Sequence, residues 1–168
     1  MDAHVVLVGL MGSGKTSVGR ALADALGRPF SDSDAWIERE RGATVRTLAD
    51  EIGVEAMHEL ESRHLLEALA APGPDVIAAA ASTIDDPACR SALTAPGVEV
   101  IWLKADPEVL ADRFERKQHR PRFGRSPRTL LADQARERDG LFRSLSPIEI
   151  ETTGKDPDDV VALALTAL

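Results

Sequence analysis

The residues best suited to chemistry lie near the start of the chain, in the stretch GLMGSGKT at positions 9–16. It matches the spacing G-x-x-x-x-G-K-[ST] and stands between an apolar, strand-like run and a helix-like segment. Glycines let backbone amides approach phosphate oxygens, Lys15 can reach the β- and γ-phosphates, and the Thr16 hydroxyl can bind Mg²⁺. The pattern therefore predicts binding of a nucleoside triphosphate with Mg²⁺. The residues expected to hold it are Gly12, Ser13, Gly14, Lys15, Thr16 and Ser17.

Two carboxylates follow the second strand-like stretch, in the sequence SDSD at 31–34. Asp32 and Asp34 would lie at the carboxyl end of that strand, where ligands of open α/β sheets collect. Beside a magnesium-triphosphate, one carboxylate can organise the water shell of the metal, and the other can accept a proton from an attacking hydroxyl. The alternative is that Asp32 or Ser33 only caps the next helix.

Cations are concentrated in one segment of an otherwise acidic chain, whose formal net charge is -8. The cationic side chains of this segment are Arg113, Arg116, Lys117, Arg120, Arg122, Arg125 and Arg128. A basic segment following a phosphate loop is typical of a lid that closes over the phosphates, and we place it at about 114–127. The alternative is a solvated basic face.

Strand-like and helix-like stretches alternate along the chain. Strands are expected at 4–9, 28–34, 76–81, 98–103 and 148–151, and helices at 15–27, 34–41, 44–51, 54–70, 86–95, 106–117, 127–143 and 156–168. This alternation predicts an α/β fold with a mostly parallel sheet covered by helices on both faces. No repeat or long linker interrupts it, so we expect one domain over residues 1–168.

Composition excludes several classes of function. The negative net charge argues against general nucleic-acid binding. No apolar run approaches the roughly 18 residues of a membrane span, and the first ten residues do not resemble a signal peptide. The single cysteine, Cys89, cannot form an internal disulfide and fits a reducing cytoplasm. We therefore expect a cytoplasmic monomer that binds neither nucleic acid nor membrane.

Several stretches together resemble one known family. Residues 7–42, LVGLMGSGKTSVGRALADALGRPFSDSDAWIERERG, are similar to the opening of the shikimate kinases, in which the same loop leads into a strand ending D-[ST]-D. Arg120-Pro121 resembles the lid motif of that family, and ERDGLF at 137–142 resembles its E-R-N-P-L-Y stretch. Asp156-Pro157 falls where the family closes on adenine. The resemblance extends over nearly the whole chain.

The resemblance implies a three-layer α/β/α P-loop NTPase fold of nucleoside-monophosphate-kinase type, with a five-stranded parallel sheet and a lid. It implies ATP and Mg²⁺ as cofactors and a small-molecule hydroxyl acceptor as the partner. On the nucleotide side it places Arg120 at the γ-phosphate as the lid cation, and Arg113 and Pro157 beside adenine. The catalytic residues would then be Lys15, Asp34 and Arg120.

On the acceptor side, the resemblance implies that Asp34 meets the acceptor hydroxyl, Asp32 assists Mg²⁺ and Arg138 holds a carboxylate of the acceptor. We expect the acceptor-binding helical region at about 33–70.

The chain departs from the family pattern only on this acceptor side. The F-R-x-x-E motif of the family falls on MHELE, so that Met57 and His58 replace phenylalanine and arginine while Glu61 remains. The G-G-G loop falls on Ala80, Ala81 and Ser82, and Gly140 replaces a proline. A histidine grips a carboxylate less firmly than an arginine does, and added side chains narrow a glycine loop. We expect an altered acceptor pocket; the alternative for the alanine run is a buried strand end of small residues.

The leading hypothesis is an ATP-dependent kinase of shikimate-kinase type that phosphorylates a hydroxyl of shikimate or a related small polar metabolite. The alternative is a catalytically silent nucleotide-binding protein that acts through a partner. A nucleotide kinase is disfavoured, because the helical stretch 44–70 has no arginine cluster to hold a second nucleotide. Trp102 is expected in the core and His64 at the surface or the edge of the core.

Overall fold

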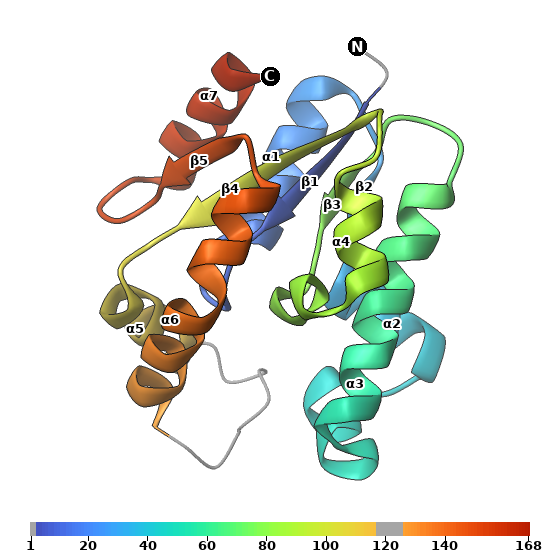
Figure 1. Ribbon diagram of the computed structural model, residues 1–168, viewed down its shortest axis with the longest axis vertical. Coiled ribbons are helices and arrows are strands. Elements are labelled where there is room, and N and C mark those ends of the chain that lie inside the picture. The colour runs from blue at the N-terminus through green and yellow to red at the C-terminus, as the bar shows by residue number, and fades with distance from the viewer. Residues whose placement is uncertain (1–2, 117–125) are drawn as a thin grey trace.

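A computed structural model describes residues 3–116 and 126–168, and within them five strands form one parallel sheet (Figure 1). The strands are β1 (His4–Val8), β2 (Phe30–Asp32), β3 (Val76–Ala78), β4 (Val98–Lys104) and β5 (Ile148–Glu151). They lie in the order β2-β3-β1-β4-β5, which puts β1 at the centre. The predicted five-stranded parallel sheet is confirmed. The predicted lid falls mostly on residues 117–125, which lie outside the described residues.

Helices cover both faces of the sheet, because the side chains of each strand alternate between two apolar layers. In β1, Val5 and Leu7 belong to one layer and Val6 and Val8 to the other. The first layer holds α1 (Lys15–Leu26) and α7 (Pro157–Ala167); the second includes α3 (Val45–Ala70), α4 (Pro87–Leu93), α5 (Pro107–Glu115) and α6 (Pro127–Leu145). The predicted three-layer arrangement is therefore confirmed.

Trp102 of β4 anchors the second layer. Its side chain is buried and stacks on Phe142 of α6, with 5.6 Å between ring centroids. Large aromatic side chains contribute much of the buried apolar area of a small domain. The prediction that Trp102 belongs to the core is confirmed.

The helices α2 (Ser33–Arg41) and α3 extend beyond the sheet and carry a small core of their own. Its buried members are Ile37, Val45, Leu48, Met57 and Leu60. The two helices predicted at 44–51 and 54–70 adjoin at Gly53, whose φ of 83° and ψ of 170° are not helical. Glycine is the residue that accepts this conformation without strain, so the chain changes direction there.

The strand predicted at 76–81 is too long. β3 ends at Ala78, and residues from Ala81 to Asp85 form a short 3-10 helix, η1. The cause lies in Thr83, whose hydroxyl and amide both donate to the Ala80 carbonyl, at 2.8 and 3.2 Å. Local hydrogen bonds of this kind compete with a strand ladder. The alanine run is therefore part strand and part turn.

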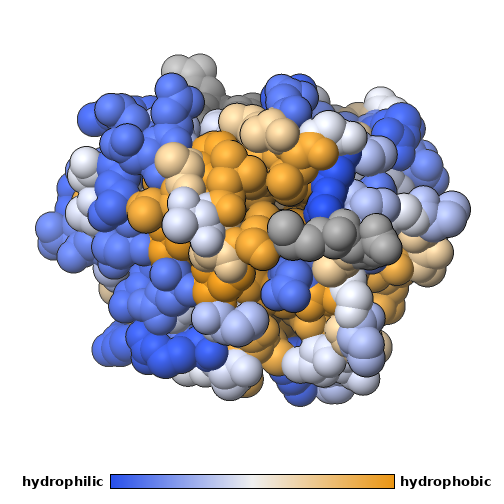
Figure 2. Space-filling model, turned by 90° about the horizontal axis from the view of Figure 1, so that it is seen from above, coloured by the Kyte–Doolittle hydropathy of each residue, from blue (hydrophilic) through white to orange (hydrophobic). Residues whose placement is uncertain are grey.

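The end of the molecule that carries the N-terminus has apolar side chains in its middle and hydrophilic ones around them (Figure 2). Among the described residues, the large apolar side chains with substantial exposure are Ile52, Val54, Leu163 and Leu165. The described helices include none with the length and apolar content of a membrane span.

Candidate active site

The phosphate loop connects β1 to α1 and is shaped by glycines with positive φ. Gly12 has a φ of 83°, and a Cβ atom there would lie 2.9 Å from the Leu110 carbonyl oxygen. Gly14, with a φ of 96°, is the N-cap of α1. The loop therefore packs against α5 and leads directly into the N-terminus of α1. The positive end of the helix dipole lies there, an arrangement that suits a phosphate anion.

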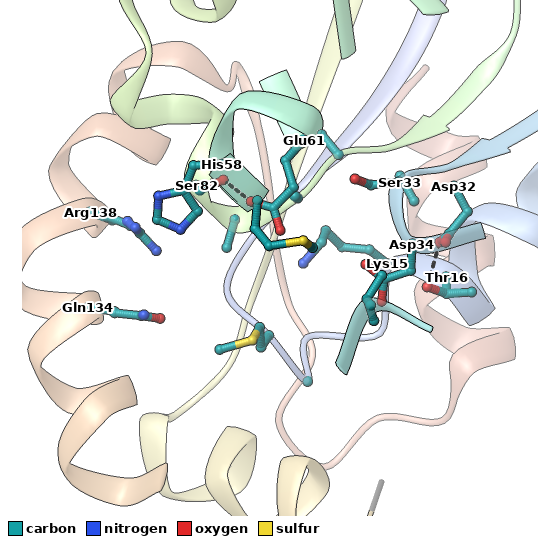
Figure 3. A pocket seen from close by; sticks show the side chains of 18 of the residues that line it. Lys15, Thr16, Asp32, Ser33, Asp34, His58, Glu61, Ser82, Gln134 and Arg138 are labelled. Carbon is teal, nitrogen blue, oxygen red and sulfur yellow. Dashed lines mark hydrogen bonds between the residues drawn. The ribbon is translucent and has the colours of Figure 1, made fainter. Parts of the chain in front are cut away.

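Lys15 extends from the first turn of α1 into the cavity beside this loop (Figure 3). Its ammonium group donates to the carbonyl oxygens of Gly9 at 2.7 Å and of Leu10 at 3.1 Å. The hydroxyl of Ser13 is buried and has no hydrogen-bond partner within the described residues. A cation held over the loop and a spare buried hydroxyl both fit an anionic ligand at this place.

Thr16 and Asp32, the two predicted magnesium ligands, lie in direct contact. The Thr16 hydroxyl donates to Asp32 Oδ2 at 2.7 Å, while Asp32 Oδ1 accepts from the Ala35 amide at 3.1 Å. Asp32 therefore caps α2 with one oxygen, as the alternative interpretation predicts, and accepts from Thr16 with the other. The described residues contain no group of three or more histidine, cysteine or acidic side chains suited to a metal.

A cavity of about 220 Å³ lies between the phosphate loop and the helices α2, α3 and α6 (Figure 3). Every described residue predicted for the acceptor lines it together with Lys15 and Thr16: Asp34, His58, Ala80, Ala81, Ser82 and Arg138. The prediction missed several lining residues, among them Met11, Ser33, Val45, Val54, Leu130 and Gln134. Gln134 could have been found, because it precedes Arg138 by four residues and so shares its helix face.

The charged groups of this cavity are tied to protein partners. Arg138 donates to Asp85 from two nitrogens, with Nη2 at 2.6 Å and Nε at 3.1 Å from Oδ2. The Ser82 hydroxyl donates to the carboxyl group of Glu61. Burial raises the pKa of Glu61 to about 7, and burial together with the nearby Arg138 lowers the pKa of His58. At neutral pH the Glu61 carboxyl group thus keeps its proton more readily than an exposed glutamate does, and the His58 imidazole is largely uncharged.

A second cavity, of about 280 Å³, adjoins the other side of the phosphate loop. The predicted Arg113 and Pro157 both line it, together with Gly12, Ser13, Gly14 and Ser17. The Arg113 guanidinium donates to the carbonyl oxygens of Gly12 at 3.3 Å and of Thr152 at 3.1 Å, which fixes its plane. Two further cations on its wall, Arg116 and Lys155, were not among the residues predicted to bind the nucleotide.

Arg120 lies in the segment 117–125, to which the structural description does not extend. His64 is not at the surface but fully buried, and its Nε2 lies 2.8 Å from the Ser31 hydroxyl. Burial lowers the pKa of His64 to about 4. A surface position for His64 is therefore wrong, because the Ser31 hydroxyl of the edge strand β2 and the Trp36 ring of α2 lie against its imidazole.

Comparison with known proteins points in one direction. A family model described as shikimate kinase matches residues 11–168. The shikimate kinase of Caulobacter vibrioides is 39% identical over 166 residues, which cover 98% of this chain and 81% of that protein. The shikimate kinase of Symbiobacterium thermophilum is also 39% identical, over 95% of this chain and 92% of the relative. Among solved structures, a shikimate kinase from Acinetobacter baumannii in complex with shikimate gives a TM-score of 0.90 at 32% identity, covering 98% of this chain and 92% of that one.

Proposed function

Because this chain belongs to the shikimate kinase family, we propose that it transfers the γ-phosphoryl group of ATP to a hydroxyl of shikimate or a closely related small polyhydroxylated metabolite. The observation that carries the proposal is that one cavity contains both halves of such a site. Lys15 and Thr16 of the phosphate loop line it together with Asp34, His58 and Arg138. Its volume of about 220 Å³ is below the roughly 300–1,000 Å³ of pockets for drug-sized ligands, which favours a small acceptor over a second nucleotide.

On the nucleotide side, the loop residues from Gly12 to Ser17 would hold the phosphates through backbone amides, with the Lys15 ammonium at the β- and γ-phosphates. Arg113 and Pro157 would flank the adenine ring in the second cavity. Arg120 of the proposed lid at about 114–127 would add a cation at the γ-phosphate. The two cavities share Gly12 and Gly14, which is consistent with a nucleotide that crosses the loop.

Mg²⁺ fits the contact between Thr16 and Asp32, because Mg²⁺ in proteins binds through one or two oxygen side chains plus substrate phosphates and water. Thr16 would ligate it directly, and Asp32 would hold its water shell. When bound, the ion neutralises charge on the phosphates. The absence of a larger acidic cluster among the described residues agrees with this mode of binding.

On the acceptor side, Asp34 lies in the first turn of α2 and lines the cavity beside Lys15. We assign it the role of accepting the proton of the attacking hydroxyl. His58, Ser82 and Arg138 would orient the acceptor, with Ala80 and Ala81 forming the wall. Residues 1–168 would act as one kinase domain, with the acceptor-binding helical region at about 33–70. We expect the protein to act as a cytoplasmic monomer.

The proposal is tested by measuring ADP release with ATP, Mg²⁺ and shikimate, followed by a panel of small polyhydroxylated acceptors. Turnover of about 1–100 s⁻¹ is expected on at least one of them. Lys15→Ala should lower kcat by about 100-fold or more, whereas Lys104→Ala, which removes a partly exposed lysine outside both cavities, should leave it unchanged. Binding of ATP without turnover on any acceptor would favour the catalytically silent alternative.

A further inference from the structure

Buried polar atoms without a hydrogen-bond partner are uncommon in folded proteins, and in the described part of this chain most of them lie at cavities. They are Ser13 Oγ, Ser33 Oγ, His64 Nδ1, Gln134 Oε1 and Ser146 Oγ. Ser13 lines the second cavity, whereas Ser33 and Gln134 line the cavity beside the phosphate loop. A buried polar group that lacks a partner costs free energy, so such a group in a cavity wall indicates a ligand that supplies the partner.

The Ser33 hydroxyl reaches the cavity beside the phosphate loop from α2. Only 3% of the residue is exposed, and its Oγ has no partner within the described part of the chain. The helix does not use this hydroxyl, because the side chain of Asp32 caps α2. In Figure 3 the oxygen points into the cavity. Since Ser33 and Asp34, the proposed base, are neighbours in the chain and both line the cavity, a hydroxyl bound by Ser33 would lie close to the one that reacts.

The Gln134 amide faces the same cavity from α6, on the side opposite to Ser33 in Figure 3. Its Oε1 atom is buried and has no partner among the described residues. Gln134 precedes Arg138 by four residues, so the two side chains lie one turn apart on one helix face. An amide accepts from a hydroxyl and also donates to an oxygen atom. It therefore suits a hydroxyl that neighbours a carboxylate held by Arg138.

Resting on the kinase function proposed above, we propose that Ser33 and Gln134 are acceptor-binding residues that hold two ring hydroxyls of the acceptor from opposite walls of the cavity. Ser33 binds a hydroxyl next to the one that is phosphorylated, and Gln134 binds a hydroxyl nearer to Arg138. Asp34 remains the group that meets the reacting hydroxyl. Two contacts besides Arg138 fix the orientation of a ring, so Ser33 and Gln134 determine which hydroxyl of a polyhydroxylated ring reaches Asp34.

The first test separates binding of the acceptor from folding. Ser33→Ala and Gln134→Leu each remove a polar atom that has no partner, so neither should lower the urea midpoint of unfolding of the ligand-free protein. With ATP and Mg²⁺ at neutral pH, each should raise KM for the acceptor about 3–10-fold and leave KM for ATP unchanged. The acceptor is shikimate, or the best substrate of the panel above if shikimate is not turned over. An unchanged KM for the acceptor would overturn the role of that residue.

Ser146→Ala is the matched control. The Ser146 hydroxyl is also buried without a partner among the described residues, but Ser146 lines neither cavity. Its substitution should leave the KM values for both substrates unchanged. Ser33→Thr keeps the hydroxyl and should retain the wild-type KM for the acceptor. An increase in Ser146→Ala as large as in Ser33→Ala would indicate a general effect of packing and would overturn the inference.

Acceptor analogues that each lack one ring hydroxyl locate the two contacts. Affinity is measured as KM or, for an analogue that is not phosphorylated, as an inhibition constant. The loss caused by Ser33→Ala should vanish for one analogue and the loss caused by Gln134→Leu for a different one, because each analogue lacks the partner of that side chain. Equal losses for every analogue would overturn the inference and leave the kinase function intact. If the wild type binds ATP yet phosphorylates no acceptor of the panel, the kinase function fails, and the inference with it.

Discussion

Replacing Glu61 by glutamine should stabilise the folded protein more at pH 8 than at pH 5. Glu61 lies largely enclosed between the cavity beside the phosphate loop and η1, and its pKa in the folded chain is raised from 4.5 to about 7. The folded state therefore binds this proton more tightly than the unfolded state does. The stability that the proton contributes is complete below pH 4.5 and is lost as the pH rises through 7. The glutamine side chain would keep an acceptor for the Ser82 hydroxyl and carry no charge.

The magnitude follows from these two pKa values. At about 1.4 kcal/mol for each tenfold change in proton affinity, the full cost of ionising Glu61 in the folded state is roughly 3.5 kcal/mol. Between pH 5 and pH 8 the advantage of Glu61→Gln over wild type should grow by about 2–3 kcal/mol, most of it below pH 7. With a urea m-value of about 2 kcal/mol per molar, the difference in midpoint grows by about 1 M.

The assay is urea unfolding of both proteins at half-unit steps from pH 5 to pH 8. The informative quantity is the difference in unfolding free energy between the two proteins, because His64 also makes stability depend on pH. The pKa of His64 is lowered from 6.5 to about 4, so its contribution to stability is lost as the pH falls through that range, opposite to the effect of Glu61. Subtraction removes the His64 contribution. Glu67→Gln, the same substitution at an exposed position of α3, is the matched control. A difference that stays constant from pH 5 to pH 8 would refute the burial argument for Glu61.

Three further variants test the nucleotide side, and a fourth tests α6. Asp32→Asn should raise the Mg²⁺ concentration needed for half-maximal activity while leaving thermal stability unchanged, because asparagine also caps α2. Arg113→Ala should raise KM for ATP and leave KM for the acceptor unaltered, because Arg113 lines the second cavity. A change only in KM for the acceptor would contradict the proposed contact of Arg113 with the nucleotide. Gly12→Ala should weaken ATP binding in calorimetry, because its φ of 83° and the Leu110 carbonyl at 2.9 Å leave no room for a methyl group. Gly140→Ala, with open space around it in α6, should instead stabilise the protein by about 0.5–1 kcal/mol in urea unfolding.

The sheet and the phosphate site could be predicted because their signals are local. The apolar run of β1 and the glycine-lysine-threonine spacing after it each lie within a few residues, and the structure places them as expected. The starts predicted for α5, α6 and α7, at 106, 127 and 156, lie within one residue of the observed ones, each of which has proline in the first turn. The limits of most elements therefore fall close to their predicted positions.

The features that escaped prediction depend on partners far apart in the sequence. Arg138 meets Asp85 across 53 residues, and His64 meets Ser31 across 33. The hydrophobic periodicity of a single helix or strand does not predict contacts between side chains of different elements. The resemblance to a known family supplied Arg138 as a site residue, but it could not show that an aspartate would occupy its guanidinium. The length of β3 was overestimated because of a contact between near neighbours. The Thr83 hydroxyl donates to the Ala80 carbonyl and favours a turn where the alanine run predicts a strand.

The separate core of α2 and α3 has a consequence for how this enzyme could change over evolutionary time. Ile37, Leu48 and Leu60 pack among themselves and not into the two layers of the sheet, and Gly53 joins the halves of α3. Substitutions in such a module alter its own packing with little cost to the sheet that holds the phosphate loop, since the effects of distant sites are close to additive. Selection can thus reshape the cavity wall at Met57 and His58 while the phosphate loop stays fixed.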